Sequence, residues 1–322
     1  MQELRADDLG AIDKVLDQLD NLHSSPLVGR KIVELTRDLN YDLGELTRCV
    51  ESDPALAAKI LRIVNSSHYG LAHRTTNLRS ALVWFGLRSL RLIALTFHLV
   101  DGLTTGLNRQ LSYHFWRRAI SMATVGARLS EKHADLERDD GYAAGLLCDL
   151  GVLALAQVVG DKYLALYEAA SDNKELLELE HNEFGFCHPA VGARLLERWE
   201  FPEEIVAATA HHHEESPDVP PLTLCAQTSD VMADALWAPE SPQLSVAQKL
   251  LETHYSTNSE GLVEMAELCK EDIRQNAELF GVRIHEQIDC DALRQAAQKQ
   301  LVEASLESAV DLEASLQATW GG

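Results

Sequence analysis

The stretch that decides the fold is DDGYAAGLLCDLGVLALAQVV, residues 139–159. After its polar start the apolar residues follow one another without the alternation of a half-buried strand, and on a helix they would cover every side. The stretch is too polar at its start and too short to span a bilayer. It is therefore predicted to form one central, almost fully buried helix, which other helices must surround.

Nearly all other segments of the 322-residue chain also have helical period, and no alternating run is long enough to predict a sheet. The stretch SYHFWRRAISMATVGARLSEKH, residues 112–133, places Phe115, Ala119, Ala123 and Ala127 on one face, where small residues allow close packing. The sequence therefore predicts an all-α, multi-helix protein.

Two short stretches, TTGLNRQ at 104–110 and APESPQ at 238–243, read as boundaries. They divide the chain into an N-terminal helical lobe (1–107), a second helical lobe (108–244) and an acidic helical extension (245–322). The apolar stripe of the extension is too narrow to form a core alone, so it should pack on the body, on a second copy in a homodimer, or on a domain outside this chain. The stripe consists of Leu293, Ala297, Leu301, Leu306, Val310 and Leu316.

The net charge of −22 argues against nucleic acid as the main partner, because phosphate binding needs clustered Lys and Arg. DNA reading by a helix pair in residues 42–65 is disfavoured for the same reason. The acidic excess lies in residues 108–322, however, and no carboxylate occurs between Asp53 and Asp101. Four basic residues in this N-terminal stretch could form a docking surface for an acidic partner or an anionic ligand, or they could pair with the acidic second lobe. They are Lys59, Arg62, Arg88 and Arg91.

The N-terminus and the cysteines indicate a cytoplasmic protein without membrane insertion. MQELRADDLGAIDKVL lacks the basic and apolar regions of a secretory signal. The six cysteines are scattered singly, without a CxxC pair, and are expected to be reduced.

One constellation of residues stands out from generic helix. His188 begins a predicted helix, the triplet HHH at 211–213 ends the next, and Asp230 lies in the middle of a third, while Asp149 lies in the central helix. Imidazole and carboxylate groups brought together in this way are ligands for a divalent ion that lowers the pKa of a bound water. The plainer alternative is that these histidines only cap helix carbonyls.

The order of these residues resembles the HD-domain phosphohydrolases, in which one helix supplies a His and the next an adjacent His-Asp pair. In this chain Arg118 stands at the first position and Cys148 precedes Asp149 at the second. A guanidinium cannot bind a cation, and its expected partner is Asp149. A thiol on an apolar helix has a raised pKa, so Cys148 is expected to be an inert filler.

Several consecutive stretches also resemble the HDOD family, a degenerate branch of the same superfamily. They are ESDPALAAKILRIVNSSHYG, NLRSALVWFGLRSLRLIAL, FWRRAISMATVGARL, AAGLLCDLGVLAL and FCHPAVGARLLERWEFPEEIVAATAHHH. The resemblance implies an all-α module of two helical lobes that acts in bacterial signal transduction, often together with cyclic-di-GMP or two-component proteins.

The sequence thus predicts a non-catalytic signalling module that binds a protein partner and has no catalytic residue, no cofactor and no metal. Its degenerate site positions are Arg118, Cys148, Asp149, His188, His212 and Asp230. The alternative is a residual phosphohydrolase that acts on a nucleotide or cyclic dinucleotide. In that case Asp149, His188, His212 and Asp230 would hold the ion.

Overall fold

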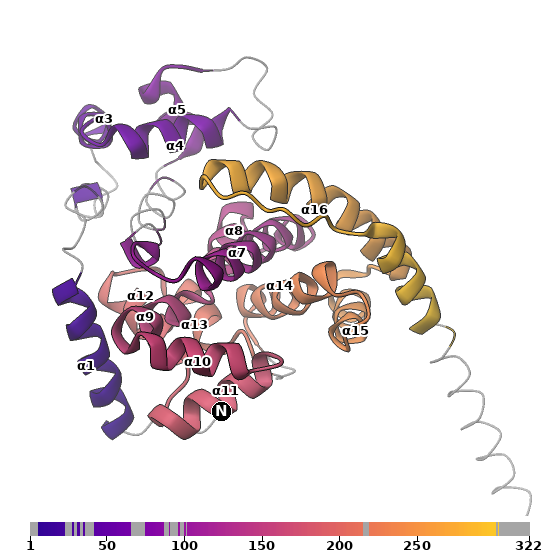
Figure 1. Cartoon of the computed structure of the whole chain (residues 1–322). Helices are drawn as coiled ribbons and strands as arrows, with labels where there is room; N and C mark the ends of the chain where they lie inside the picture. Colours follow the sequence, from indigo (N-terminus) through magenta and orange to yellow (C-terminus); the bar gives the residue numbers. More distant parts are fainter. Residues whose placement is uncertain are drawn as a thin grey trace, which may run out of the picture.

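A computed structural model of the chain describes residues 6–22, 28, 31–32, 35, 42–65, 75–86, 90, 96, 100, 102–214, 219–300 and 302 (Figure 1). Within these ranges every regular element is an α-helix and no strand occurs. The all-α prediction is therefore confirmed.

The central apolar stretch forms two helices, so the prediction of a single helix is wrong. Helix α8 spans Arg138–Leu147 and α9 spans Leu150–Val159, with Cys148 and Asp149 in the turn between them. The backbone keeps only one-turn contacts there: the amide of Cys148 donates to the carbonyl of Ala144, and that of Val152 to the carbonyl of Asp149. The turn lies where the Asp149 carboxylate meets the long helix α7 (Arg109–Ser130).

Residues 138–159 belong to the core because they are buried, and not because they are too short to span a membrane. By length and composition the segment Arg138–Val159 could cross a membrane, so the sequence argument that it is too short is wrong. In the fold, however, 78% of its apolar window is buried among other helices of the same chain. That is the pattern of a core helix.

Small residues let α7 lie close against α8. A Cβ on Gly145 would be 2.4 Å from the backbone oxygen of Met122, and one on Gly126 would be 2.4 Å from that of Gly141. The face predicted from Phe115, Ala119, Ala123 and Ala127 is buried, with at most 2% exposure. The close contact between α7 and α8 therefore depends on glycine and alanine at the interface.

Six further helices surround this centre and contribute to the larger core. Helix α14 (Pro221–Trp237) packs on α7, and α12 (His188–Arg198) packs on α9 and α13 (Glu203–His211). The shorter helices α10 (Asp161–Ala169) and α11 (Asn173–Phe184) connect α9 to α12. Helix α1 (Ala6–Leu22) lies against α9 and α12 and joins the same core.

Helices α3 (Leu43–Glu51), α4 (Pro54–Val64) and α5 (Leu78–Phe85) form a second, smaller core. Asp42 caps α3 by accepting from the amides of Gly44 and Glu45, and Asp53 accepts from the amide of Leu56 at the start of α4. Figure 1 shows these three helices together at one end of the molecule. The larger core, however, also takes in Ile12, Leu16 and Leu19 of α1, which belong to the predicted N-terminal lobe.

The C-terminal region packs on the second lobe. It contains α15 (Gln243–Tyr255), α16 (Ser259–Leu279) and a helical stretch over 290–300. Helix α16 lies against α7, and Leu293 and Ala297 of the predicted stripe are buried in the larger core. The other members of the stripe, Leu301, Leu306, Val310 and Leu316, lie outside the described residues. The domain boundaries at 107 and 244 stay a prediction.

Candidate functional site

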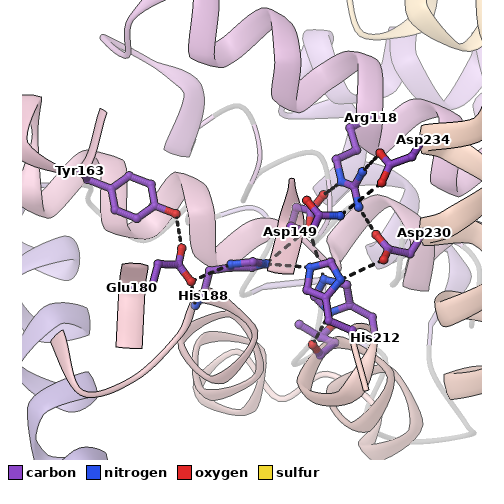
Figure 2. Close-up of polar contacts among 11 residues, drawn as sticks. Arg118, Asp149, Tyr163, Glu180, His188, His212, Asp230 and Asp234 are labelled. Carbon is purple, nitrogen blue, oxygen red and sulfur yellow. Dashed lines mark hydrogen bonds and ion pairs between the residues drawn. The ribbon is translucent and has the colours of Figure 1, made fainter. Parts of the chain in front are cut away.

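Arg118, on α7, is the centre of the site. Its Nε donates to Oδ2 of Asp149 at 2.7 Å, which is the pair expected from the sequence. Its two terminal nitrogens donate to Asp230 and Asp234, one turn apart on α14 (Figure 2). One guanidinium therefore joins the α8–α9 turn to α14 through three carboxylates.

The charges of this group stabilise one another in a buried place. Burial alone would lower the pKa of Arg118, but Asp234 and Asp149 raise it above its usual value. Burial would raise the pKa of Asp149, but Arg118 and His212 hold it well below its usual value. Arginine and aspartate are therefore both charged at neutral pH.

Cys148 takes no part in this network. Its side chain is fully buried, and burial raises the pKa of the thiol well above its usual value. A neutral, buried thiol is a poor nucleophile and a poor ligand. The residue that stands beside Asp149 in the sequence thus fills apolar space in the core.

Three histidines lie on the other side of Asp149. His188 begins α12, and His212 and His213 follow the end of α13, so the two helix ends meet. Burial lowers the pKa of His212, and it lowers that of His213 well below the usual value. Burial also acts on His188, but the Glu180 carboxylate outweighs it and raises the pKa of that imidazole.

Each of these three imidazoles has an oxygen atom next to its Nδ1. The pairs are His188 with Oε2 of Glu180 (2.9 Å), His212 with the carbonyl of Thr209 (2.8 Å) and His213 with Oδ2 of Asp230 (2.9 Å). The Nε2 atoms point toward one another and toward Oδ1 of Asp149. Histidines oriented in this way are typical of metal centres, where an outer oxygen fixes each ring.

Glu180 is itself held in place. It is fully buried and accepts from the Tyr163 hydroxyl at 2.5 Å and from the backbone amide of His188 at 2.8 Å (Figure 2). Burial and the Glu180 carboxylate raise the pKa of Tyr163 well above its usual value, so this tyrosine remains a donor.

The structure brings together all the degenerate site positions named from the sequence except the inert Cys148 side chain. The group of potential ligands, however, contains Asp149, His188, His212 and His213. Asp230 instead contacts His213 and Arg118.

Sequence reasoning missed Asp234, Glu180 and the separate role of His213. Asp234 lies four residues after Asp230, so helical spacing could have found it. Nothing in the sequence near Glu180 distinguishes it from the other acidic residues of α11.

The proposed basic surface is only partly described. Arg62 is exposed on α4 and Lys59 is partly buried on the same helix. Arg88 and Arg91 lie outside the described residues.

Comparison with known proteins matches the HDOD domain family over residues 22–215. An uncharacterized protein from Treponema pallidum (strain Nichols) is 23% identical over 206 residues, which are 62% of this chain and 39% of that protein. The chain therefore spans about two fifths of the length of that curated relative.

Solved structures share the fold. A candidate signal transduction protein from Marinobacter aquaeolei VT8 has a TM-score of 0.65 and 23% identity, over 85% of this chain and 65% of that one. A candidate phosphohydrolase from Shewanella amazonensis SB2B has a TM-score of 0.62 and 18% identity, over 83% and 97%. An HDOD domain protein from Geobacter sulfurreducens has a TM-score of 0.60 and 21% identity, over 97% of both chains.

At these identities the structures show a shared fold alone. The family match, in contrast, covers more than half of the sequence and includes Arg118, Asp149 and the three histidines. The chain belongs to the HDOD family.

Proposed function

We propose that this chain is a non-catalytic signal-transduction module that presents a helical surface to a protein partner. The observation that carries the proposal is the position of Arg118, whose guanidinium contacts Asp149, Asp230 and Asp234. A hydrolytic metal centre needs carboxylates free to bind the ion and an open position for water. Here a permanent cation is hydrogen-bonded to all three carboxylates and would repel a metal ion bound beside it.

The partner is expected to be a signalling protein of the bacterial cytoplasm, connected to cyclic-di-GMP or two-component signalling. Its docking surface would include the basic residues Lys59, Arg62, Arg88 and Arg91, which favour an acidic partner. Neither nucleic acid nor a membrane is expected to serve as the partner of this acidic chain. The similarity in fold to the Marinobacter signal transduction protein is consistent with this role.

The alternative is a residual metal-dependent phosphohydrolase that acts on a nucleotide or cyclic dinucleotide. The specific observation that favours it is the cluster of Asp149 with three imidazoles. The Shewanella neighbour named as a candidate phosphohydrolase shares only the fold.

A phosphodiesterase assay separates the two functions. The purified chain is incubated with bis(p-nitrophenyl) phosphate and with cyclic di-GMP, in Mn²⁺ and in Fe²⁺, beside an Asp149→Asn variant. We expect the wild type to show no more turnover than the Asp149→Asn variant, because the Arg118 guanidinium is already hydrogen-bonded to the carboxylates. Turnover in the wild type that disappears in both Asp149→Asn and His212→Gln would establish the enzyme.

A partner-capture experiment tests the docking surface. Lys59→Glu/Arg62→Glu and Arg88→Glu/Arg91→Glu should each reduce capture of the partner from the native host at least tenfold, because like charges would face each other. The matched control is Arg109→Glu, a charge reversal at an exposed position of α7 outside the basic stretch. Equal loss in the control, or a change in thermal stability alone, contradicts the docking surface.

A further inference from the structure

We infer that this chain binds a small aromatic carboxylate in a groove between α16, the connecting segment 282–288 and the end of α14. The groove encloses about 530 Å³, within the range of roughly 300–1,000 Å³ that is usual for small-molecule sites. All of its lining residues lie beyond residue 215, where the match to the family ends. The groove therefore contains no residue of the Arg118 group.

The groove forms because the chain turns back along α16. The amide of Val282 donates to the carbonyl of Ala277 at 2.9 Å, and segment 282–288 then runs back beside that helix (Figure 1). Glu286 fixes the segment to α7, because its carboxylate accepts from the Tyr113 hydroxyl and lies 3.2 Å from a terminal nitrogen of Arg117. Both walls are therefore in place before any ligand binds.

The lining of the groove is largely apolar and includes one aromatic ring. Nε1 of Trp237 donates to the Ser121 hydroxyl at 2.9 Å, and the guanidinium of Arg117 lies 5.2 Å from the centre of its ring. An indole held in this way offers a rigid surface against which another aromatic ring can pack. The other apolar lining residues are aliphatic: Ile273, Ala277, Val282, Ile284 and Ile288.

The charged side chains around this lining leave two cations unpaired. Lys270 and Arg283 both line the groove, and neither has a carboxylate partner in the part of the chain that the structure describes. The three carboxylates of the groove, in contrast, already have arginine partners. They are Glu271 and Glu278, which pair with Arg274, and Glu286, which pairs with Arg117.

The charge of these two cations decides which ligand the groove favours. The whole chain carries a net charge of −22, but at 0.1 M ionic strength charges more than about 10 Å away are largely screened. A carboxylate would pair with Lys270 or Arg283 while its apolar part packs on the lining. An uncharged ligand would keep only the apolar contact. The chemistry that fits best is therefore an aromatic acid.

The position of the groove suits a site that senses a small molecule, a use that rests on the proposed signalling role. Phe280 lies between α16 and segment 282–288, and it packs against both the larger and the smaller core. A ligand in the groove would thus lie beside a connection between the two lobes.

Titration calorimetry with two matched probes tests the site. The full chain is titrated in 0.1 M salt with 2-naphthoate and with the uncharged 2-naphthamide. We expect one 2-naphthoate per chain, bound about three- to tenfold more tightly than the amide, because one or two exposed ion pairs contribute that much. No saturable binding of 2-naphthoate, or equal affinities for the two probes, overturns the inference.

Loss of the two cations should remove the preference for the acid. In Lys270→Gln/Arg283→Gln the two probes should bind equally, at the affinity that the wild type has for the amide. The control is Lys249→Gln, because Lys249 is exposed on α15 and does not line the groove. A preference that survives the double substitution, or that disappears in the control, contradicts the site.

A second pair of variants tests the apolar lining. Ile284→Asp places a carboxylate in the groove, so the affinity for 2-naphthoate should fall more than tenfold through lost apolar contact and like charge. The control is Val246→Asp, because Val246 is 37% exposed on α15 outside the groove. Wild-type affinity in a cooperatively unfolding Ile284→Asp chain, or the same loss in both variants, overturns the inference.

These measurements can fail separately from the proposed function. Capture of a protein partner tests the signalling role without any ligand, whereas the titrations need no partner. A chain that binds its partner but not 2-naphthoate keeps the proposed function and loses the groove ligand.

Discussion

Arg118 is a single cation that pairs with carboxylates from two separate parts of the fold. Its side chain is 15% exposed, while those of Asp149 and Asp230 are each 7% exposed. Charges at this depth are costly when they lose their partner, although the intact group need not add stability compared with apolar residues. The main role of the guanidinium is therefore to offset the cost of burying the aspartate charges, and not to make the protein more stable than an apolar core would be.

Replacing Arg118 with methionine should destabilise the protein strongly. Arg118→Met keeps much of the length but leaves the carboxylates of Asp149 and Asp230 buried without a cation, a change that costs about 3–5 kcal/mol. Urea unfolding measures the loss in the free energy of unfolding.

The control for this change is Arg117→Met. Arg117 contacts Glu286 at the surface and lies over the ring of Trp237, so its loss should cost only about 1 kcal/mol. Similar costs for the two variants would contradict the buried role of Arg118.

Residue types and helical spacing account for only part of this site. The Arg118–Asp149 pair could be predicted because an arginine and an aspartate stand where a related family places metal ligands. Which of His212 and His213 contacts Asp149 could not be predicted. Adjacent residues at a helix end point in different directions, and the local backbone decides these directions. Glu180 reaches His188 through the turn between α11 and α12, and that contact has no periodic signal.

Gly151 allows the backbones of α9 and α12 to lie in close contact. A Cβ on Gly151 would lie 1.9 Å from the carbonyl oxygen of His188, at the start of α12. Because backbone cannot move aside as a flexible side chain can, Gly151→Ala should force α9 and α12 apart. Overpacking of this kind costs about 1–3 kcal/mol, which thermal or urea unfolding can measure.

Gly10 supplies the control for this variant. It lies in α1, and a Cβ there would meet no atom within 4 Å. Gly10→Ala should stabilise the protein by about 0.8–1 kcal/mol, because alanine has the higher helix propensity. A neutral or stabilising effect of Gly151→Ala would show that α9 and α12 do not touch closely.

Acid should weaken the attachment of α1 to α12. Asp13 accepts from Nε of Arg194 at 2.9 Å and from Arg198 at 3.0 Å, and these hydrogen bonds lower its pKa below the ordinary 3.8. Since the native pKa is the lower one, the contribution to stability is complete above the unfolded-state pKa and is lost as pH falls through the native value. Asp13→Asn should therefore lower Tm at neutral pH and match the wild type in strong acid.

The arginine partners provide the check on this pH dependence. In an Arg194→Gln/Arg198→Gln background, the further substitution Asp13→Asn should change Tm little at any pH. A Tm difference between wild type and Asp13→Asn that stays the same from neutral pH to strong acid would contradict the ion pair.

Helix existence could be predicted from periodicity, but the break in the central helix could not. The residues on both sides of Cys148 and Asp149 are apolar, and no proline marks the turn. Asp149 occupies the N-cap position of α9, but its side chain makes no capping hydrogen bond there. The turn depends on contacts from other helices: Arg118 of α7 and His212 after α13 both bind the Asp149 carboxylate. Tertiary contacts of this kind are not encoded locally.

The larger core extends well beyond the region that matches the family. The family match ends at residue 215, while buried side chains of α14, α15, α16 and residues 290–300 belong to the same core as α7 and α9. Trp116 of α7 packs on Phe280 with ring centroids 4.6 Å apart, and it is only 6% exposed. At the scale of the whole molecule, the second lobe and the C-terminal helices therefore share one hydrophobic core.

Removal of the C-terminal helices should consequently unfold or loosen the second lobe. A chain ending at residue 242 loses α15, α16 and Phe280, which leaves Trp116 and the adjoining face of α7 in water. We expect it to aggregate or to bind ANS, with little near-UV circular dichroism, as loosely packed states do. A chain ending at residue 302 keeps every described helix and should unfold cooperatively at the wild-type midpoint. If the chain ending at 242 also unfolds cooperatively at that midpoint, with unchanged tryptophan emission, the C-terminal helices are a separate domain and the single core across residue 244 is wrong.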